Sequence, residues 1–205
     1  MNVNGWGVGK FEDICEELYA SGLDLVGLSE THLRERQNMT GRLDRYRMIT
    51  KGRSRWTKAG GGVALLIRNN FHLLTDEIEL DDNQECEDIL CVRIEYNVKN
   101  IKETVIVCVC YMTTEGTDAA RDNRLKYSGL MRICRRYENE RVIVMGDMNG
   151  HIGLLGENVN NNGRLLLDFA DESNLEILNL TMGERCATWH GRRGERSAID
   201  YFLVN

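Results

Sequence analysis

Short runs rich in valine, isoleucine and leucine most restrict how this chain of 205 residues can fold. Such runs, bounded by glycine or polar residues, are typical of buried strands. Two of them are joined only by the polar VKNIKE, which predicts a hairpin and therefore mixed rather than purely parallel sheets. The runs are LDLVGLSE, GGGVALLIRN, ILCVRIEY, TVIVCVCY, RVIVMGD and SAIDYFLV.

Helical patterns stand between these runs. In residues 10–22 apolar positions recur at helical spacing until Gly22, and residues 118–138 and 164–174 also carry helical patterns. The length suits one hydrophobic core, and no repeat or linker is visible. We therefore expect an α/β protein in which residues 1–205 form a single domain.

Composition narrows the class of protein. A formal net charge of −6 argues against a dedicated nucleic-acid coating protein, although a local basic patch is compatible with it. The seven cysteines include no C-x-x-C pair, which favours reduced core thiols in a reducing compartment. No run is long enough for a membrane span or resembles a signal peptide. We expect a soluble intracellular protein without a membrane partner.

Hard oxygen donors stand at or within the ends of the apolar runs. Taken alone, each is more simply a turn former, because Asn and Asp hydrogen-bond to nearby backbone. Asp200 resists this explanation, since it interrupts SAIDYFLV and an unpaired buried charge is costly. Together such donors suit Mg²⁺, which takes one or two carboxylates plus waters and phosphate oxygens, so the pattern favours phosphoryl chemistry. The donors are Asn2, Asn4, Glu30, Asp147, Asn149 and Asp200.

A family resemblance covers essentially the whole chain. The ordered segments MNVNG, LSETHL, CVCY, GDMNGHIG, ATW and SAIDYFLV resemble the endonuclease/exonuclease/phosphatase superfamily. Within it, the chain is most similar to the apurinic/apyrimidinic-type endonuclease domain of non-LTR (LINE-type) retrotransposons of the RTE clade, and to craniofacial-development-type proteins. This second similarity is carried by GKFEDICEEL, LSETHLR, GGGVALLIRN, NGRLLLDFADESNLEILN and TWHGRRGERSAIDYFLV. The resemblance implies a four-layer αββα sandwich of two mixed sheets flanked by helices, with a metal site at one rim.

The resemblance also implies roles around that metal. Glu30 would be the principal ligand of Mg²⁺, with Mn²⁺ as the alternative, and Asn4 would lie beside it. Asn2 would hydrogen-bond to the catalytic network, and Tyr111 would contact the scissile phosphate.

Three further residues would carry the reaction. By resemblance, Asp147 would orient or deprotonate the attacking water, and Asn149 would hold a phosphate oxygen. This division is physically reasonable, because a carboxylate accepts a proton and an amide donates to an anionic oxygen. Asp200 would pair with a histidine. Residues expected near the nucleic-acid strand are His32, Thr188, Ser197, Arg192 and Arg193.

Two features depart from the family. The histidine that would pair with Asp200 belongs to an S-D-H segment that this sequence does not contain, so we expect a fold truncated at both ends, without its final strand, and weak nicking. None of the histidines at 32, 72, 151 and 190 has that context. Relatives commonly have proline two residues after the tyrosine, whereas this chain has Thr113 and no proline at all. We expect a looser loop there.

Basic residues gather in two segments. The first is 34–58, and the second holds Arg192, Arg193 and Arg196. Both are either solvated loops or surfaces that bind DNA phosphates beside the metal. Trp56 and Trp189 would extend such a surface by stacking, although we expect Trp189 in the core.

The leading hypothesis is a Mg²⁺-dependent DNA endonuclease domain of a retrotransposon. Its nick would leave a 3′-hydroxyl from which a reverse transcriptase domain of the same polyprotein could prime, with the nucleus as the place of action. One alternative is a phosphatase or phosphodiesterase of the same superfamily, since one rim chemistry serves many substrates. The other is a catalytically inactive relic or binding module.

Overall fold

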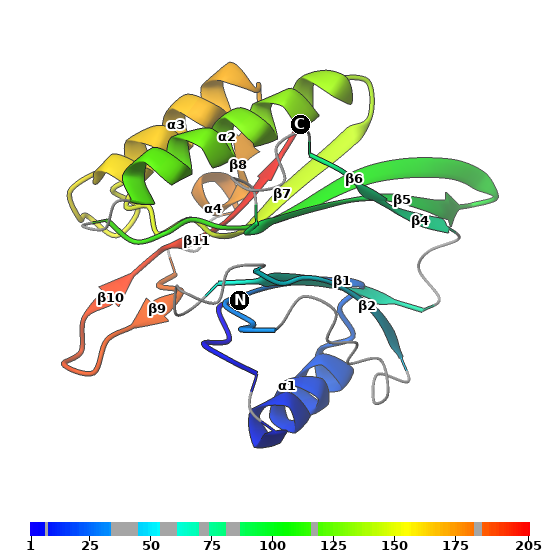
Figure 1. Cartoon of the computed structure of the whole chain (residues 1–205), viewed down its shortest axis with the longest axis horizontal. Helices are drawn as coiled ribbons and strands as arrows, with labels where there is room; N and C mark the ends of the chain where they lie inside the picture. The colour runs from blue at the N-terminus through cyan, green and yellow to red at the C-terminus, as the bar shows by residue number, and fades with distance from the viewer. Residues whose placement is uncertain are drawn as a thin grey trace.

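The computed structural model has four layers, in the order helix, sheet, sheet, helices (Figure 1). The first layer is helix α1 (Val8–Ser21). It covers a sheet of order β1-β3-β2, made of β1 (Leu25–Ser29), β2 (Tyr46–Lys51) and β3 (Val63–Arg68). The structure describes residues 1–6, 8–33, 45–53, 61–69, 74–80, 87–115, 119–182 and 186–205.

The second sheet has the order β4-β5-β6-β7-β11-β8. Helices α2 (Ala119–Arg136) and α3 (Asn161–Glu172) cover its outer face. The pair β6–β7 is parallel and the other pairs are antiparallel, so this sheet is mixed, as expected. Its strands are β4 (Leu74–Ile78), β5 (Ile89–Val98), β6 (Ile101–Tyr111), β7 (Arg141–Asp147), β8 (Glu176–Ile177) and β11 (Asp200–Val204).

Each pair of neighbouring layers encloses its own apolar core. Along β5, Leu90, Val92 and Ile94 pack between the two sheets, whereas Ile89 and Cys91 pack against the outer helices. Because side chains alternate across a strand, a continuous apolar run supplies both cores at once. A third core joins α1 to the first sheet through residues such as Leu18 and Leu28. The four-layer αββα expectation is confirmed.

The hairpin between β5 and β6 shows how local sequence sets the register. Its two turn residues, Lys99 and Asn100, have φ of 49° and 68°, the left-handed conformation that two-residue hairpin turns require. Val98 consequently pairs with Ile101, and the register continues to Ile89 opposite Cys110.

Several sequence expectations need correction. Strand β2 lies within segment 34–58, which was read as polar loop, while residues 34–44 and 54–60 lie outside the described part. Strands β9 (Trp189–His190) and β10 (Arg196–Ser197), a short hairpin, and the four-residue helix α4 (Leu178–Thr181) were not predicted. Cysteines 15, 91, 108, 110 and 134 are buried free thiols, as predicted, but Cys186 is exposed. Among the described helices, none has the length and apolar character needed to cross a membrane.

Candidate active site

The predicted polar residues meet where the second sheet borders the first. Tyr111 ends β6 directly beside Asp147 at the end of β7, and Asp200 at the start of β11 is paired with Asp147 from the other side. Glu30 follows β1 in the facing sheet. Residues distant in sequence thus reach one place because several strands end or begin at the same edge.

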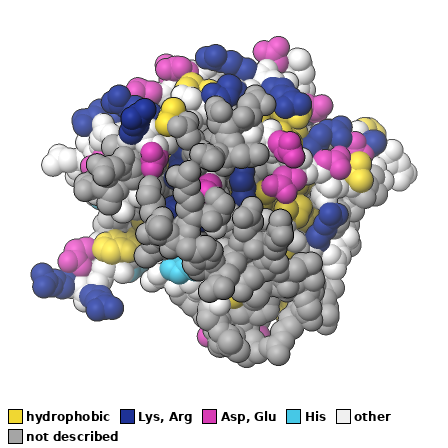
Figure 2. All heavy atoms as spheres, in the orientation of Figure 1, with side chains coloured by type: hydrophobic (Ala, Val, Ile, Leu, Met, Phe, Trp, Pro, Cys, Tyr) yellow, Lys and Arg dark blue, Asp and Glu magenta, His cyan; other side chains and the backbone are white. Residues whose placement is uncertain are grey.

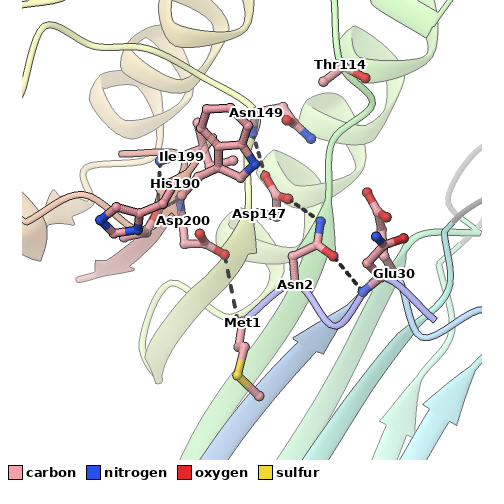
Figure 3. Close-up of a pocket in the computed structure, with 12 residues that line it drawn as sticks. Met1, Asn2, Glu30, Thr114, Asp147, Asn149, His190, Ile199 and Asp200 are labelled. Atoms are coloured by element: carbon pink, nitrogen blue, oxygen red, sulfur yellow. Dashed lines mark hydrogen bonds and ion pairs between the residues drawn. The ribbon is translucent and has the colours of Figure 1, made fainter. Parts of the chain in front are cut away.

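Glu30, Asp147 and Asp200 line one cavity of about 640 Å³, whereas Tyr111 is not among its lining residues. Figure 3 shows Asp147 near its centre, between Glu30 and Asp200, with Asn2 and Asn149 close to it. The structure therefore brings the predicted donors together, whereas their catalytic roles stay predictions. The lining residues are Met1, Asn2, Asn4, Glu30, Thr114, Asp147, Asn149, Thr188, Trp189, His190, Ile199 and Asp200.

Asp147 is the most constrained of these groups. Its side chain accepts hydrogen bonds from Nδ2 of Asn2 at 2.9 Å and from the backbone N–H of Asn149 at 3.0 Å. Only 1% of the residue is exposed. Burial, with the nearby negative charges of Asp200 and Glu30, raises the pKa of Asp147 to about 7 despite both donors. The carboxylate is thus held in a fixed direction and changes charge near neutral pH.

Gly146, the residue before Asp147, has a backbone conformation and a close neighbour that a larger residue would not allow. Its φ is +147°, and a Cβ at this position would overlap the carbonyl oxygen of Cys110 on the neighbouring strand. A larger residue would push β7 away from β6 and move Asp147 with it.

Side-chain amides hold the loop after Tyr111, where relatives have a proline. The Thr113 N–H donates to Oδ1 of Asn123 at 2.9 Å, and the Thr113 carbonyl accepts from Nδ2 of Asn123 at 2.7 Å and of Asn162 at 2.9 Å. A proline at position 113 would lack this N–H. These partly buried hydrogen bonds hold the backbone of Thr113, and the expectation of a looser loop stays a prediction.

Asn162, together with Asn160, also holds the loop that carries Asn149. Its carbonyl accepts from Nδ2 of Asn160 and of Asn162, both at 3.2 Å. Its own Nδ2 donates to the carbonyl of Met112 at 2.7 Å. An amide nitrogen has two N–H groups, so this contact leaves a second donor for a phosphate oxygen.

Glu30 lies at a strained position beside Tyr111. Its φ is +52°, and His32 (φ +53°), Asn4 (φ +42°) and Asn149 (φ +46°) share this left-handed conformation, which side chains rarely adopt and which concentrates at functional sites. Burial first, and then the interaction with the Glu30 carboxylate, raises the pKa of Tyr111. His32 Nε2 is 3.8 Å from Glu30 Oε2, although His32 does not line the cavity.

Asp200 is held through its backbone. The hydroxyl of Thr188 accepts from the N–H groups of Ile199 at 3.0 Å and Asp200 at 3.1 Å. In the described part of the chain, Asp200 Oδ1 is buried without a hydrogen-bond partner, but the amino group of Met1 lies 3.9 Å from it and forms an ion pair with it. Ser197 pairs with Trp189 in the hairpin and does not line the cavity.

The β9–β10 hairpin projects from the body beside the cavity (Figure 1), and Figure 2 shows basic side chains at its tip. Arg192 and Arg193 lie in its turn, outside the cavity lining. Trp189 is 45% exposed and lines the cavity, so its predicted place in the core was wrong. The two-residue strands of the hairpin pair only with each other and belong to neither of the two larger sheets.

The sequence profile described as "Endonuclease/Exonuclease/phosphatase family" matches residues 1–205. The chain belongs to this family. A comparison with curated proteins found no sequence match.

Solved structures of low identity share the fold. The AP endonuclease LMAP from Leishmania major aligns with a TM-score of 0.74 at 15% identity, over 100% of this chain and 77% of the other. The 3′ phosphatase NExo from Neisseria, bound to a product DNA hairpin, gives 0.74 at 16% over 100% and 84%. The endonuclease domain of TRAS1, a telomere-specific non-LTR retrotransposon, gives 0.69 at 13% over 100% and 83%.

Members of the endonuclease/exonuclease/phosphatase family generally hydrolyse phosphodiester bonds and typically depend on divalent metals. The cavity suits such a cation. Glu30, Asp147 and Asp200 line it without any Lys or Arg, and the Met1 amino group, 3.9 Å from Asp200 Oδ1, is the one positive group that the structure places against them among the described lining residues. Asp147 and Asp200 are direct cross-strand partners, an unfavourable arrangement for like charges. Among the described residues, no group of three or more His, Cys, Asp or Glu side chains is arranged to hold a metal ion.

Sequence reasoning missed several residues of this region. His190 and Thr114 line the cavity, and Asn123 and Asn162 hold its loops. His190 was set aside because it lacks the family context, and the buried asparagines carry no signal because their partners are distant in sequence.

Proposed function

We propose that this chain is a Mg²⁺-dependent DNA endonuclease of the retrotransposon type, which hydrolyses one strand to leave a 3′-hydroxyl. Reverse transcription from that end would make a reverse transcriptase domain its partner. The observation that carries the proposal is a buried carboxylate, Asp147, whose pKa is raised to about 7 beside Glu30 and Asp200 in one cavity. The sequence resemblance to RTE-type domains and the shared fold with the TRAS1 endonuclease domain support the retrotransposon class.

Glu30 would hold the cation, with Asn4 beside it. When bound there, the cation supplies electrostatic stabilisation of the charge that develops on the phosphate. Mn²⁺ suits the same oxygen donors.

Asp147 accepts the proton of the attacking water in this proposal. A general base works best when its pKa is near the working pH, and an ordinary aspartate pKa of about 4 is too low for this. Asn2 and the Asn149 N–H fix the direction of the carboxylate. The second N–H of the Asn149 amide and the Tyr111 hydroxyl then contact phosphate oxygens.

The hairpin favours a polymeric substrate over a small phosphate ester. It places Trp189 and His190 at the cavity and Arg192 and Arg193 beyond it. Charges outside the cavity would contact phosphates flanking the scissile one, which a small substrate lacks. His32 and Thr188 are proposed to face the same strand.

The test is nicking of supercoiled plasmid with Mg²⁺, Mn²⁺ or chelator, by the unaltered protein, Glu30→Gln and the surface control Glu17→Gln. We expect metal-dependent nicks that a DNA polymerase extends, loss of at least about 100-fold in Glu30→Gln, and no loss in the control. Mn²⁺ binding, followed by electron paramagnetic resonance, should weaken in Glu30→Gln alone.

The same proteins are assayed for phosphate release from inositol phosphates and from 3′-phosphorylated DNA. Phosphate release without nicking would establish the phosphatase alternative. Neither activity, with Mn²⁺ binding unaffected by Glu30→Gln, would establish an inactive binding module and overturn the proposal.

A further inference from the structure

Three buried charged side chains meet directly behind Tyr111. Asp88 and Lys126 are 2% and 4% exposed, and the Arg53 side chain is 14% exposed. Arg53 follows β2 of the first sheet, Asp88 precedes β5 of the second, and Lys126 lies on α2. We call Arg53, Asp88 and Lys126 the charged triad; it joins three of the four layers.

Asp88 hydrogen-bonds to both other members of the triad. The carboxylate accepts from Arg53 Nε at 2.8 Å, from Arg53 Nη2 at 2.6 Å and from Lys126 Nζ at 2.9 Å. Burial works against its charge, but the hydrogen bonds and charges of Arg53 and Lys126 hold the pKa of Asp88 below its ordinary value. The triad is therefore ionised and carries a net charge of +1.

Stability alone is a weak reason for such a group. Removing ions from water costs several kcal/mol each, and apolar side chains of similar volume often stabilise a protein as well or better. What a buried ionic group supplies in addition is direction, because each hydrogen bond fixes the placement of its partners.

The partners that the triad fixes belong to Tyr111. The Tyr111 N–H donates to the Asp88 carbonyl at 2.9 Å, and Lys126 Nζ donates to the Tyr111 carbonyl at 3.0 Å. Arg53 Cζ and Lys126 Nζ lie 5.9 Å and 5.8 Å from the centroid of its ring. Both backbone polar groups and the ring of Tyr111 are thus held by this one cluster.

The same cluster reaches the segment after Glu30. Asp88 Oδ1 accepts from the Gly62 N–H at 3.1 Å, and the Gly62 carbonyl accepts from the Thr31 N–H at 3.2 Å. The Arg53 guanidinium occupies the space that a Cβ at Gly61 would fill. The triad therefore binds the backbone of Tyr111 in the second sheet and, through Gly62, the residue that follows Glu30 in the first.

We infer that the charged triad is a positioning device that fixes the Tyr111 hydroxyl relative to Glu30 across the gap between the sheets. None of its members lines the cavity, so they are positioning residues rather than catalytic ones. The inference rests on the proposed function, in which Tyr111 contacts the phosphate and Glu30 holds the cation. A displacement of about 1 Å at such a contact costs on the order of 100-fold in rate.

The test compares Lys126→Met, which keeps the length of the side chain and the Arg53–Asp88 pair, with Leu130→Ala one turn along the same helix. Leu130 is fully buried in the apolar core between α2 and the second sheet, and no hydrogen bond joins it to the triad, so its variant controls for lost stability. For Lys126→Met we expect kcat to fall about 10- to 100-fold with KM within about twofold. In Leu130→Ala, kcat should stay near that of the unaltered protein at temperatures where the variant is folded.

Tyr111 is followed independently by NMR of ¹³C-labelled tyrosine rings, with its signal assigned through Tyr111→Phe. The signal should shift in Lys126→Met and not in Leu130→Ala. If Lys126→Met does not fold, Arg53→Lys replaces it in both measurements, because this variant keeps the charge and loses the paired hydrogen bonds. An unmoved Tyr111 signal, or an unchanged kcat, overturns the inference while nicking by the unaltered protein upholds the proposed function. If the unaltered protein does not nick DNA, the proposed function fails and the Tyr111 signal still decides the positioning.

Discussion

The two sides of the cavity are built in different ways. On the side of the strand ends, Asp147, Asn123 and Asn162 are almost fully buried, and each makes hydrogen bonds that fix its direction. On the side of the hairpin, Trp189 is largely exposed and the strands are two residues long. Reaction chemistry needs atoms held to a fraction of an ångström, whereas a surface that meets a long substrate gains from access.

Substitutions on the two sides should therefore have different effects. Changes among the strand ends should lower the rate or the stability, because buried groups lose partners. Changes in the hairpin should alter binding of DNA and leave the fold intact.

The largest expected effect is that of Asp147→Asn. Loss of the base should lower kcat for nicking about 10²- to 10⁴-fold. The variant should fold, because the side chain keeps its shape and one acceptor. The measurement is single-turnover nicking at saturating DNA, with the exposed Asp168→Asn on α3 as control. A loss of less than about tenfold would assign the base to another group.

Asn162→Ala should combine lower stability with a lower rate. It leaves the Thr113 and Asn149 carbonyls short of a donor and removes the acceptor of Asn123 Nδ2. We expect a loss of about 2 kcal/mol in the free energy of unfolding and about tenfold in kcat, since both loops carry site residues. Urea unfolding and nicking test this. The exposed Asn97→Ala should change neither, and equal losses in both variants would contradict the role of the amides.

The raised pKa of Asp147 predicts a pH dependence of stability in the metal-free protein. Between its unfolded and folded pKa values, about 4 and about 7, the folded protein keeps a proton that the unfolded chain has released. The free energy of unfolding therefore falls as pH rises through this window.

Urea unfolding of the unaltered protein and Asp147→Asn in chelator measures this contribution. Relative to Asp147→Asn, the unaltered protein should lose roughly 1 to 2 kcal/mol in its free energy of unfolding between about pH 5 and about pH 7. If the free energies of unfolding of the two proteins changed with pH in parallel, Asp147 would have an ordinary pKa. Mg²⁺ should reduce the slope by compensating the negative charge.

The sequence predicted the strand-end side better than the hairpin side. Buried strands are long apolar runs that end on polar residues, so Glu30, Asp147 and Asp200 could be recognised and their meeting expected from the shared sheet edge. Strand β2 was missed because YRMITK holds two charged residues and no continuous apolar run, and only Tyr46 in it is buried. The hairpin was missed because two-residue strands in a charged, glycine-rich segment carry no periodic signal.

The buried polar clusters were beyond sequence reasoning for another reason. Asp88 and Lys126 are 38 positions apart, and Asn123 and Asn162 are 39 apart. Each residue type alone is more common on surfaces. Only the packing of α2 and α3 over the second sheet shows that these side chains satisfy one another.

The smallest effect is expected at the tip of the hairpin. Arg193→Ala removes a charge from an exposed turn and keeps the backbone N–H that donates to Glu195, so the free energy of unfolding should change by less than about 0.5 kcal/mol. If the side chain contacts one DNA phosphate, the slope of log Kd against log salt should decrease by about 0.9, with affinity several-fold weaker at low salt. Arg193→Lys should retain most of the slope, because a lysine keeps the charge. Fluorescence anisotropy of labelled duplex across a salt series measures both quantities.

At saturating DNA the kcat of Arg193→Ala should equal that of the unaltered protein. A lower kcat would mean that the hairpin belongs to the reaction chemistry and that the contrast between the two sides is wrong.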